Sequence, residues 1–192
     1  MFNAVIEGRK SQTRRIIKTD GNIAEFPLND GGSLYDRNTG YFIKSLNPRY
    51  KVGETVFIKE PYFLKWYDKK NYDVWYKYTD ADALIENCKL WKNKLFMPAK
   101  YARYFIEIVS VKCERLQDIS DEDCLKEGVE RWNGFFHTNI FDKKNKRLLV
   151  HKTPQEAYAA LIDSINGKGT WKSNPYVWVY EFKLVNNKIT NE

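Results

Sequence analysis

The stretch RYFIEIVSVKCERL, residues 103–116, decides the fold of this chain. Apolar side chains occupy both alternating sets of positions along it, from Phe105 to Cys113. This pattern is typical of a strand that is covered on both sides, because successive side chains of a strand point to opposite faces of the sheet. We therefore predict one long, bent strand that packs on both faces.

Two helices are predicted after this strand, over residues 120–128 and 153–167. Each begins at a hydroxyl side chain, Ser120 or Thr153, that is followed three residues later by a carboxylate, and each ends at a glycine. These are the end signals of capped helices in globular proteins. On the second helix, three apolar side chains are expected to face inward: Ala160, Leu161 and Ile165.

The remaining apolar segments predict one short helix and further strands. The helix begins near Phe2 and ends at Gly8, and a strand over residues 55–60 ends at Pro61. The stretch YVWVYEFKLV, residues 176–185, is an alternating strand in which the valines face away from Trp178, Tyr180 and Phe182. Scattered strands with a few helices predict a mainly β, α+β fold, with a mixed sheet or a barrel and no alternating βαβ unit.

A length of 192 residues favours one domain over residues 1–192, with a core that needs no disulfide. Residues 20–49 are rich in Gly, Asn, Asp and Pro, so we predict a loop there with room for a hairpin. Residues 71–78 form another β-rich segment, and residues 80–88 have helix-like content. The charged run DKKNKR, residues 142–147, is typical of a hairpin tip.

The charge balance favours an anionic partner. Lys and Arg number 32 and Asp and Glu number 25, which gives a net charge of +7. Such an excess favours anionic partners such as RNA or single-stranded nucleic acid. The 6 Trp and 13 Tyr residues supply flat faces that suit either a core or the stacking of bases.

The cysteine and histidine pattern argues against a structural zinc site. The 3 Cys lack CxxC spacing, and the 2 His, His137 and His151, are too far apart to form a local ligand pair. We therefore predict no metal and no cofactor. The chain has no apolar run near the roughly 20 residues that span a bilayer, and its apolar N-terminal segment is too short for a signal peptide. We expect a cytoplasmic protein with reduced thiols and no membrane partner.

The N-terminal basic stretch contains the pattern Gly8-x-Lys10-x-x-Thr13-x-Arg15. A glycine that ends a helix turns the chain into the next strand, and spacing of three residues across that bend can bring Lys10 near Thr13. Arg15 then lies on the same side of the strand as Thr13. A hydroxyl beside an ammonium group is a candidate nucleophile or anion site. Glu127 stands out separately, because a carboxylate opposes the negative end of a helix dipole.

This pattern resembles the signature of the ASCH family, a branch of the PUA-like β-barrels. Four further segments are similar to its longer, phage-associated members: residues 50–60, 97–108, 115–130 and 167–185. Residues 19–49 and 61–95 carry little of the resemblance, and we interpret them as two long insertions. The resemblance implies a PUA-like open β-barrel with peripheral helices and a cleft for RNA, nucleotides or modified bases.

The resemblance also implies a reaction. Some small bacterial members of the family are amidohydrolases that remove the acetyl group of N4-acetylcytidine with a lysine, a threonine and a glutamate. Carried over to this chain, those residues are Lys10, Thr13 and Glu127, with Gly8 and Arg15 beside the substrate. Lys10 would deprotonate Thr13, and Thr13 would attack the amide carbonyl. A base of this kind needs a lowered pKa, which burial or a nearby Arg15 supplies and an ionised Glu127 opposes.

Other interpretations stay open. Lys10 and Arg15 are equally typical of surface charges, and Thr13 is an ordinary strand residue. A non-catalytic RNA- or DNA-binding module would use the basic and aromatic segment around Lys65 and Trp66 as a further substrate-binding surface. A metal-independent ribonuclease is the least favoured reading, because neither histidine has a place near the motif.

Overall fold

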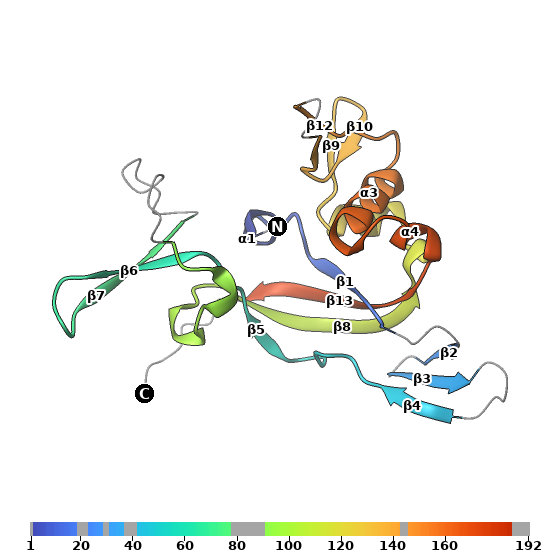
Figure 1. Cartoon of the computed structure of the whole chain (residues 1–192), viewed down its shortest axis with the longest axis horizontal. Helices are drawn as coiled ribbons and strands as arrows, with labels where there is room; N and C mark the ends of the chain where they lie inside the picture. The colour runs from blue at the N-terminus through green and yellow to red at the C-terminus, as the bar shows by residue number, and fades with distance from the viewer. Residues whose placement is uncertain are drawn as a thin grey trace.

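The computed structural model describes residues 2–18, 23–28, 31–36, 42–77, 91–142 and 146–185. A four-stranded antiparallel sheet lies at its centre (Figure 1). The strand order is β1–β13–β8–β5, with the bounds Gln12–Ile16, Tyr176–Val185, Phe105–Arg115 and Thr55–Phe57. All strand pairings that the structure describes are antiparallel, so the described strands form no mixed sheet.

The long strand predicted from the sequence is confirmed as β8, and β13 pairs with it from end to end. Tyr176 lies opposite Arg115, and Val185 lies opposite Phe105. A bulge interrupts the register between Glu181 and Phe182 of β13. The extra residue is Val109 of β8, and a bulge bends the strand that contains it, in keeping with the bend predicted for this strand.

β5 is shorter than the predicted strand over residues 55–60. Its last pair joins Phe57 to Phe105, the first residue of β8. Beyond that point Ile58 keeps one backbone hydrogen bond, to the carbonyl of Tyr104. β5 therefore ends because its partner strand β8 has no residue beyond Phe105 to pair with it, and not because of Pro61.

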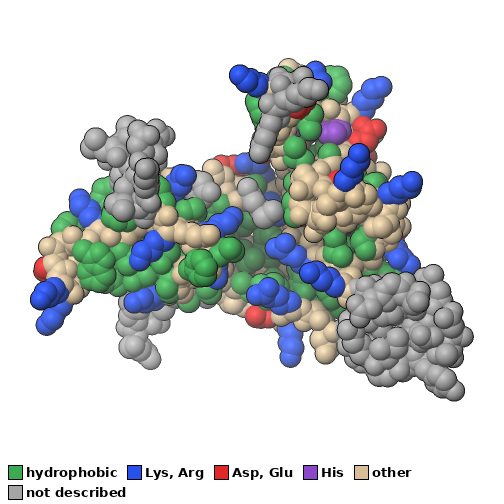
Figure 2. Space-filling model, in the orientation of Figure 1, with side chains coloured by type: hydrophobic (Ala, Val, Ile, Leu, Met, Phe, Trp, Pro, Cys, Tyr) green, Lys and Arg blue, Asp and Glu red, His purple; other side chains and the backbone are tan. Residues whose placement is uncertain are grey.

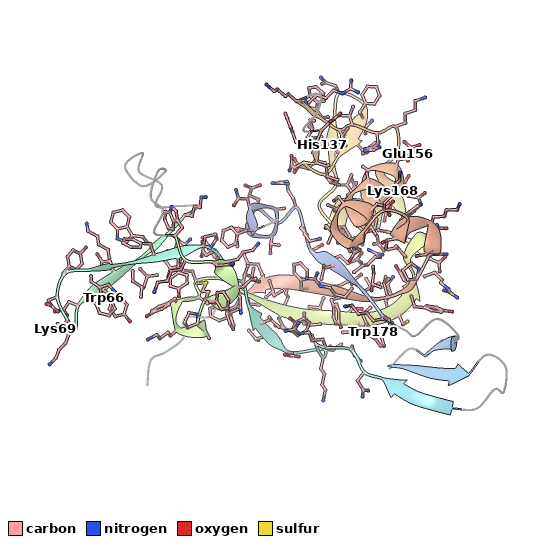
Figure 3. The ribbon with its side chains drawn as sticks, in the orientation of Figure 1. Trp66, Lys69, His137, Glu156, Lys168 and Trp178 are labelled. Atoms are coloured by element: carbon pink, nitrogen blue, oxygen red, sulfur yellow. The ribbon has the colours of Figure 1, made fainter. Side chains whose placement is uncertain are left out.

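The two faces of the sheet carry separate apolar clusters, as the alternation in β13 predicts. Val177 and Val179 face helices α2 (Asp121–Lys126) and α3 (Pro154–Asn166), where they pack with Leu116 and Tyr158. Trp178 belongs to the opposite cluster, with Val5 of helix α1 (Phe2–Ile6). In Figure 3, Trp178 lies on the side of the sheet away from α3.

Both predicted helix starts are confirmed. The side-chain oxygens of Ser120 and Thr153 accept hydrogen bonds from the backbone N–H groups three residues later, at 3.1 Å in each case. The prediction for Ile165 was wrong, because its side chain is 58% exposed. It lies in the last turn of α3 and borders a small cavity rather than packed side chains. The buried residues of α3 are Pro154, Ala157, Tyr158 and Ile162.

The two segments interpreted as insertions each form a small sheet outside the central one. Strands β2, β3 and β4 form one of them, where a loop with room for a hairpin was predicted; they span Ile23–Leu28, Gly31–Asp36 and Phe42–Leu46. β6 (Tyr62–Trp66) and β7 (Tyr72–Tyr76) form a hairpin that extends away from the helices (Figure 1). The helix-like segment 80–88 lies outside the described residues.

The remaining elements are short. Two strand pairs follow α2: β9 (Glu130–Trp132) with β10 (Phe135–His137), and β11 (Phe141–Asp142) with β12 (Arg147–Leu148). The second pair flanks the predicted hairpin tip, of which residues 143–145 lie outside the described residues. The others are α4 (Thr170–Ser173) and three 3-10 turns, η1 (Lys94–Phe96), η2 (Ala99–Tyr101) and η3 (Leu116–Asp118). The fold is therefore mainly β, of the α+β class.

The described helices are too short or too polar for any of them to span a membrane.

Leu116 provides a test of the core between the sheet and the helices. It is fully buried in η3, whereas Leu95 in η1 is 65% exposed. We expect Leu116→Ala to lower the free energy of unfolding by about 2–5 kcal/mol, because it leaves a cavity between α2, α3 and β13. The matched change Leu95→Ala should cost less than about 0.5 kcal/mol. Urea denaturation of both variants measures this, and equal losses would contradict the assigned core.

Candidate active site around the Lys10–Glu127 ion pair

The turn after α1 places Lys10 against the end of α2. Gly8 has a φ of +73°, a backbone conformation that favours glycine, and its N–H bonds to the carbonyl of Val5 at 3.1 Å. The N–H of Lys10 then bonds to the carbonyl of Ala4 at 2.8 Å. One residue later, the N–H of Ser11 bonds to the carbonyl of Lys126 at 3.0 Å. The start of β1 is thereby fixed beside the residues that follow α2.

Lys10 and Glu127 form a buried ion pair. The Lys10 Nζ donates to Glu127 Oε2 at 2.6 Å and also to the Glu127 carbonyl oxygen at 2.6 Å. Each side chain is only 4% exposed. Gly128 has a φ of +96°, and a Cβ built there would lie 3.6 Å from Lys10 Cδ, so the lysine stem passes directly over this turn. The pair therefore joins two segments 117 residues apart.

Arg14 is the second cation of the site, and the sequence analysis did not single it out. Its guanidinium is fully buried and donates to Glu127 Oε1 at 3.3 Å and to Gln12 Oε1 at 2.6 Å. It also donates to Glu114 Oε1 at 2.7 and 2.9 Å and to Asp123 Oδ2 at 3.0 Å. The alternation of β1 was the available signal, since Gln12 and Arg14 fall on the face opposite Thr13 and Arg15.

Burial lowers the pKa of Lys10 below its ordinary value of 10.5. The positive charges of Arg15 and Arg14 lower it further, whereas the charge and hydrogen bond of Glu127 raise it. Burial is the largest of these influences, so the net shift favours the neutral amine. Burial and Glu127 shift the Lys10 pKa in opposite directions, as the sequence analysis anticipated. The net result is a lower pKa, which is the direction that a general base requires.

Tyr158 of α3 completes the surroundings of the carboxylate. Its hydroxyl donates to Glu127 Oε1 at 3.4 Å, and burial, followed by the negative charge of Glu127, raises its pKa. Tyr158 therefore remains a neutral hydrogen-bond donor. Glu127 thus receives hydrogen bonds from Lys10, Arg14 and Tyr158, which hold both of its carboxylate oxygens in place.

Two cavities meet at the ion pair. The larger, of about 320 Å³, is lined by Lys10, Glu127 and Gly128 together with residues of α1 and of the segment after α2. Its volume lies in the range of sites that hold small organic ligands. The smaller, of about 70 Å³, is lined by Lys10, Glu127, Thr13 and Tyr158 among others, and has room for only a few water molecules or a small acyl group.

Thr13 lies beside the ion pair but is not bonded to Lys10 in the part of the chain that the structure describes. It is opposite Tyr180 in the register of β1 and β13, and Arg15 is opposite Trp178. Thr13 and Arg15 thus share one face of the strand, as their spacing indicates, and Arg14 occupies the other. Thr13 and Lys10 are both among the residues that line the small cavity.

The structure separates Lys65 and Trp66 from this site. Both belong to β6, and Figure 3 shows Trp66 and Lys69 toward the far end of the hairpin. Neither lines the two cavities that contain Lys10. If Lys65 and Trp66 bind a substrate, they do so on the surface of the β6–β7 hairpin and not at the Lys10–Glu127 pair. No cluster of three or more His, Cys, Asp or Glu side chains suited to a metal ion occurs among the described residues.

Comparison with family models, with curated proteins and with solved structures found no match for this chain.

The lowered pKa of Lys10 predicts how stability depends on pH. The folded protein releases this proton at a lower pH than the unfolded chain does, so the unfolded state binds more protons as the pH approaches 10.5. Below the folded pKa both states are protonated, and the cost of burying the charge is fully present. We expect the free energy of unfolding of the wild type, relative to Lys10→Met, to rise as the pH increases from below the folded-state pKa of Lys10 toward 10.5.

Chemical denaturation across this pH range measures the difference. Glu127→Gln supplies a second arm, because removing the carboxylate removes the influence that raises the Lys10 pKa, so the rise should begin at a lower pH. A wild-type advantage that stays constant or falls with increasing pH would refute the lowered pKa.

Proposed function

We propose that this protein is an ASCH-like, PUA-like enzyme that hydrolyses the amide of an N4-acylated cytosine such as N4-acetylcytidine. The observation that carries the proposal is the buried Lys10–Glu127 pair, in which Lys10 has a lowered pKa and borders both a ligand-sized cavity and the cavity that contains Thr13. A lowered pKa brings the amine closer to the neutral form that a general base for a hydroxyl nucleophile requires.

In this mechanism the acyl group of the substrate occupies the small cavity. The neutral Lys10 amine takes the proton of the Thr13 hydroxyl, and the Thr13 oxygen forms a bond to the amide carbonyl carbon. Collapse of the tetrahedral intermediate breaks the C–N bond, and Lys10 returns the proton to the departing amino group of cytosine. A water molecule, deprotonated in the same way, then hydrolyses the Thr13 ester and releases the carboxylic acid.

The other buried groups position Lys10. Glu127 accepts the hydrogen bond that fixes the Lys10 amine, and Arg14 and Tyr158 hold the Glu127 carboxylate from the other side. Arg14 also contributes positive charge that favours the neutral form of Lys10. Neither His137 nor His151 lines the cavities at Lys10, which weighs against a ribonuclease that uses histidine.

Hydrolysis of N4-acetylcytidine by the purified chain tests the proposal. We expect Lys10→Ala and Thr13→Ala each to lower kcat/KM by about 10²–10⁴-fold, because each removes a partner in the proton transfer. Thr13→Ser keeps the hydroxyl and should retain most of the activity. The rate should increase with pH as Lys10 loses its proton.

Lys183→Ala is the control, since Lys183 is an exposed lysine at the far end of the central sheet. Absence of acetate release by the wild type would remove the enzyme proposal. Full activity of Thr13→Ala would remove Thr13 as the nucleophile.

A second candidate function, binding of single-stranded nucleic acid without turnover, is favoured by the β6–β7 hairpin. Trp66 is 54% exposed and Tyr67 is similarly open, while Tyr62 is buried and belongs to the base of the hairpin. The Lys65 Nζ lies 5.0 Å from the centre of the Trp75 ring and 5.5 Å from that of Tyr67. Open aromatic faces beside lysines suit stacked bases and their phosphates.

Titration with a short single-stranded RNA tests this surface. We expect Trp66→Ala to weaken binding by about 5- to 150-fold, the effect of losing one stacked base. Trp132→Ala is the matched control, because Trp132 is equally exposed on β9. Lys65→Gln should reduce the slope of log affinity against log salt concentration by about one. Equal losses in the two tryptophan variants would show that the hairpin is not the binding surface.

A further inference from the structure

A third cavity lies on the face of the central sheet opposite α3. It has a volume of about 590 Å³. The buried rings of Trp178 and Tyr180 form part of its wall. The cavity is distinct from the two that meet at the Lys10–Glu127 pair, because neither of those residues lines it.

Three cations line this cavity. Arg15 and Lys18 come from β1 and the residues after it, and Arg49 comes from the segment that precedes β5. All three side chains are exposed, and no Asp or Glu is among the described residues that line the cavity with them. In the part of the chain that the structure describes, none of the three forms an ion pair, whereas Arg9, Arg14 and Arg103 all do. Their charge is therefore available to an anion.

Contacts with the buried aromatic residues hold the Arg49 side of the cavity in place. The backbone N–H of Arg49 donates to the Tyr180 hydroxyl at 2.9 Å. The rings of Tyr50 and Tyr180 meet edge to face, with 5.5 Å between their centres. The Arg49 guanidinium carbon lies 5.3 Å from the centre of the Tyr50 ring. Arg49 is thus anchored through its backbone while its guanidinium stays exposed over an aromatic ring.

The chemistry of this lining specifies a class of ligand. Arginine and lysine side chains that line one cavity, with no carboxylate among its described lining residues, suit the oxygens of a phosphate group. The volume exceeds what a phosphate alone would fill and lies in the range of sites for small organic ligands. The net charge of +7 adds a long-range attraction for anions.

We propose that this cavity binds the phosphate group of a nucleotide through Arg15, Lys18 and Arg49, with the nucleoside part against the aromatic wall of Tyr50 and Trp178. The proposal goes beyond the hydrolysis proposed above, since it concerns a separate site that shares only Arg15 and Ile16 with the small cavity beside Lys10. The phosphate can belong to a free nucleotide or to a single-stranded nucleic acid.

Calorimetric titration of the full chain tests the proposal with four probes: cytidine, cytidine 5′-monophosphate, inorganic phosphate and a short single-stranded RNA. We expect cytidine 5′-monophosphate to bind at least about tenfold more tightly than cytidine, because the phosphate contributes charge-assisted hydrogen bonds. RNA that binds more tightly than the mononucleotide, with a salt slope greater than one, would identify a phosphodiester as the ligand; equal affinities would identify a free nucleotide.

Variants of the lining locate the binding. Arg49→Gln and Lys18→Gln should each weaken binding of cytidine 5′-monophosphate by about tenfold, whereas Lys183→Gln, an exposed lysine outside the cavity, should change it less than twofold. All three replace exposed side chains, so the fold should persist. Equal binding of cytidine and its monophosphate, no binding of any phosphate probe at millimolar concentration, or an equal loss in Lys183→Gln would overturn the proposal.

Variants of the two sites should lose their functions independently in these assays. Lys10→Ala should lower the rate of N4-acetylcytidine hydrolysis and leave binding of cytidine 5′-monophosphate unchanged. Arg49→Gln should weaken binding of cytidine 5′-monophosphate and leave the hydrolysis unchanged, because the nucleoside substrate carries no phosphate. Loss of both functions in Lys10→Ala would contradict the separation of the two sites.

Discussion

The antiparallel pairing of β8 with β13 is the constraint on which the rest of the structure depends. Its register fixes which side chains of β13 face the helices and which face the opposite side, and β1 pairs with the outer edge of β13. Val177 and Val179 therefore pack against α2 and α3, and Trp178 and Tyr180 pack on the opposite face of the sheet. A shift of one residue would exchange the two faces, so the pairing determines the fold and both candidate sites together.

Burial of the Lys10 charge carries a cost of desolvation that Glu127 only partly offsets, whereas the carboxylate partners of Arg14 outweigh that cost and raise the Arg14 pKa. A core of apolar residues could fill the same space at lower cost. Retaining two cations around one carboxylate, with the pKa of Lys10 lowered, is more readily explained by chemistry at the cavity than by stability. The ion pair also ties the turn after α1 to the end of α2, so the same contact serves the fold and the site.

The two faces of the sheet differ in their electrostatics. Toward α3, the buried cations Lys10 and Arg14 are matched by the carboxylates of Glu114, Asp123 and Glu127. On the opposite face, Arg15 and Arg49 border an open cavity whose described lining contains no carboxylate. Matched buried charges suit proton transfer, and unmatched exposed cations suit the recognition of phosphate. The hydrolysis and the phosphate binding proposed above each need one of these arrangements, and β1 contributes residues to both faces through its alternation.

The sequence by itself determined the elements whose signals are local. The apolar run of β8, the hydroxyl caps Ser120 and Thr153, and the alternation of β13 each depend on neighbouring residues, and each was predicted where the structure has it. The sequence also singled out Lys10 and Glu127, but it placed them with Trp66 and overlooked Arg14. Only the tertiary structure decided these points, because the partners of Arg14 at Glu114 and Asp123 are about a hundred residues away and are set by strand register and helix packing. Burial, which sets the direction of the Lys10 pKa, likewise exists only once distant segments have packed together.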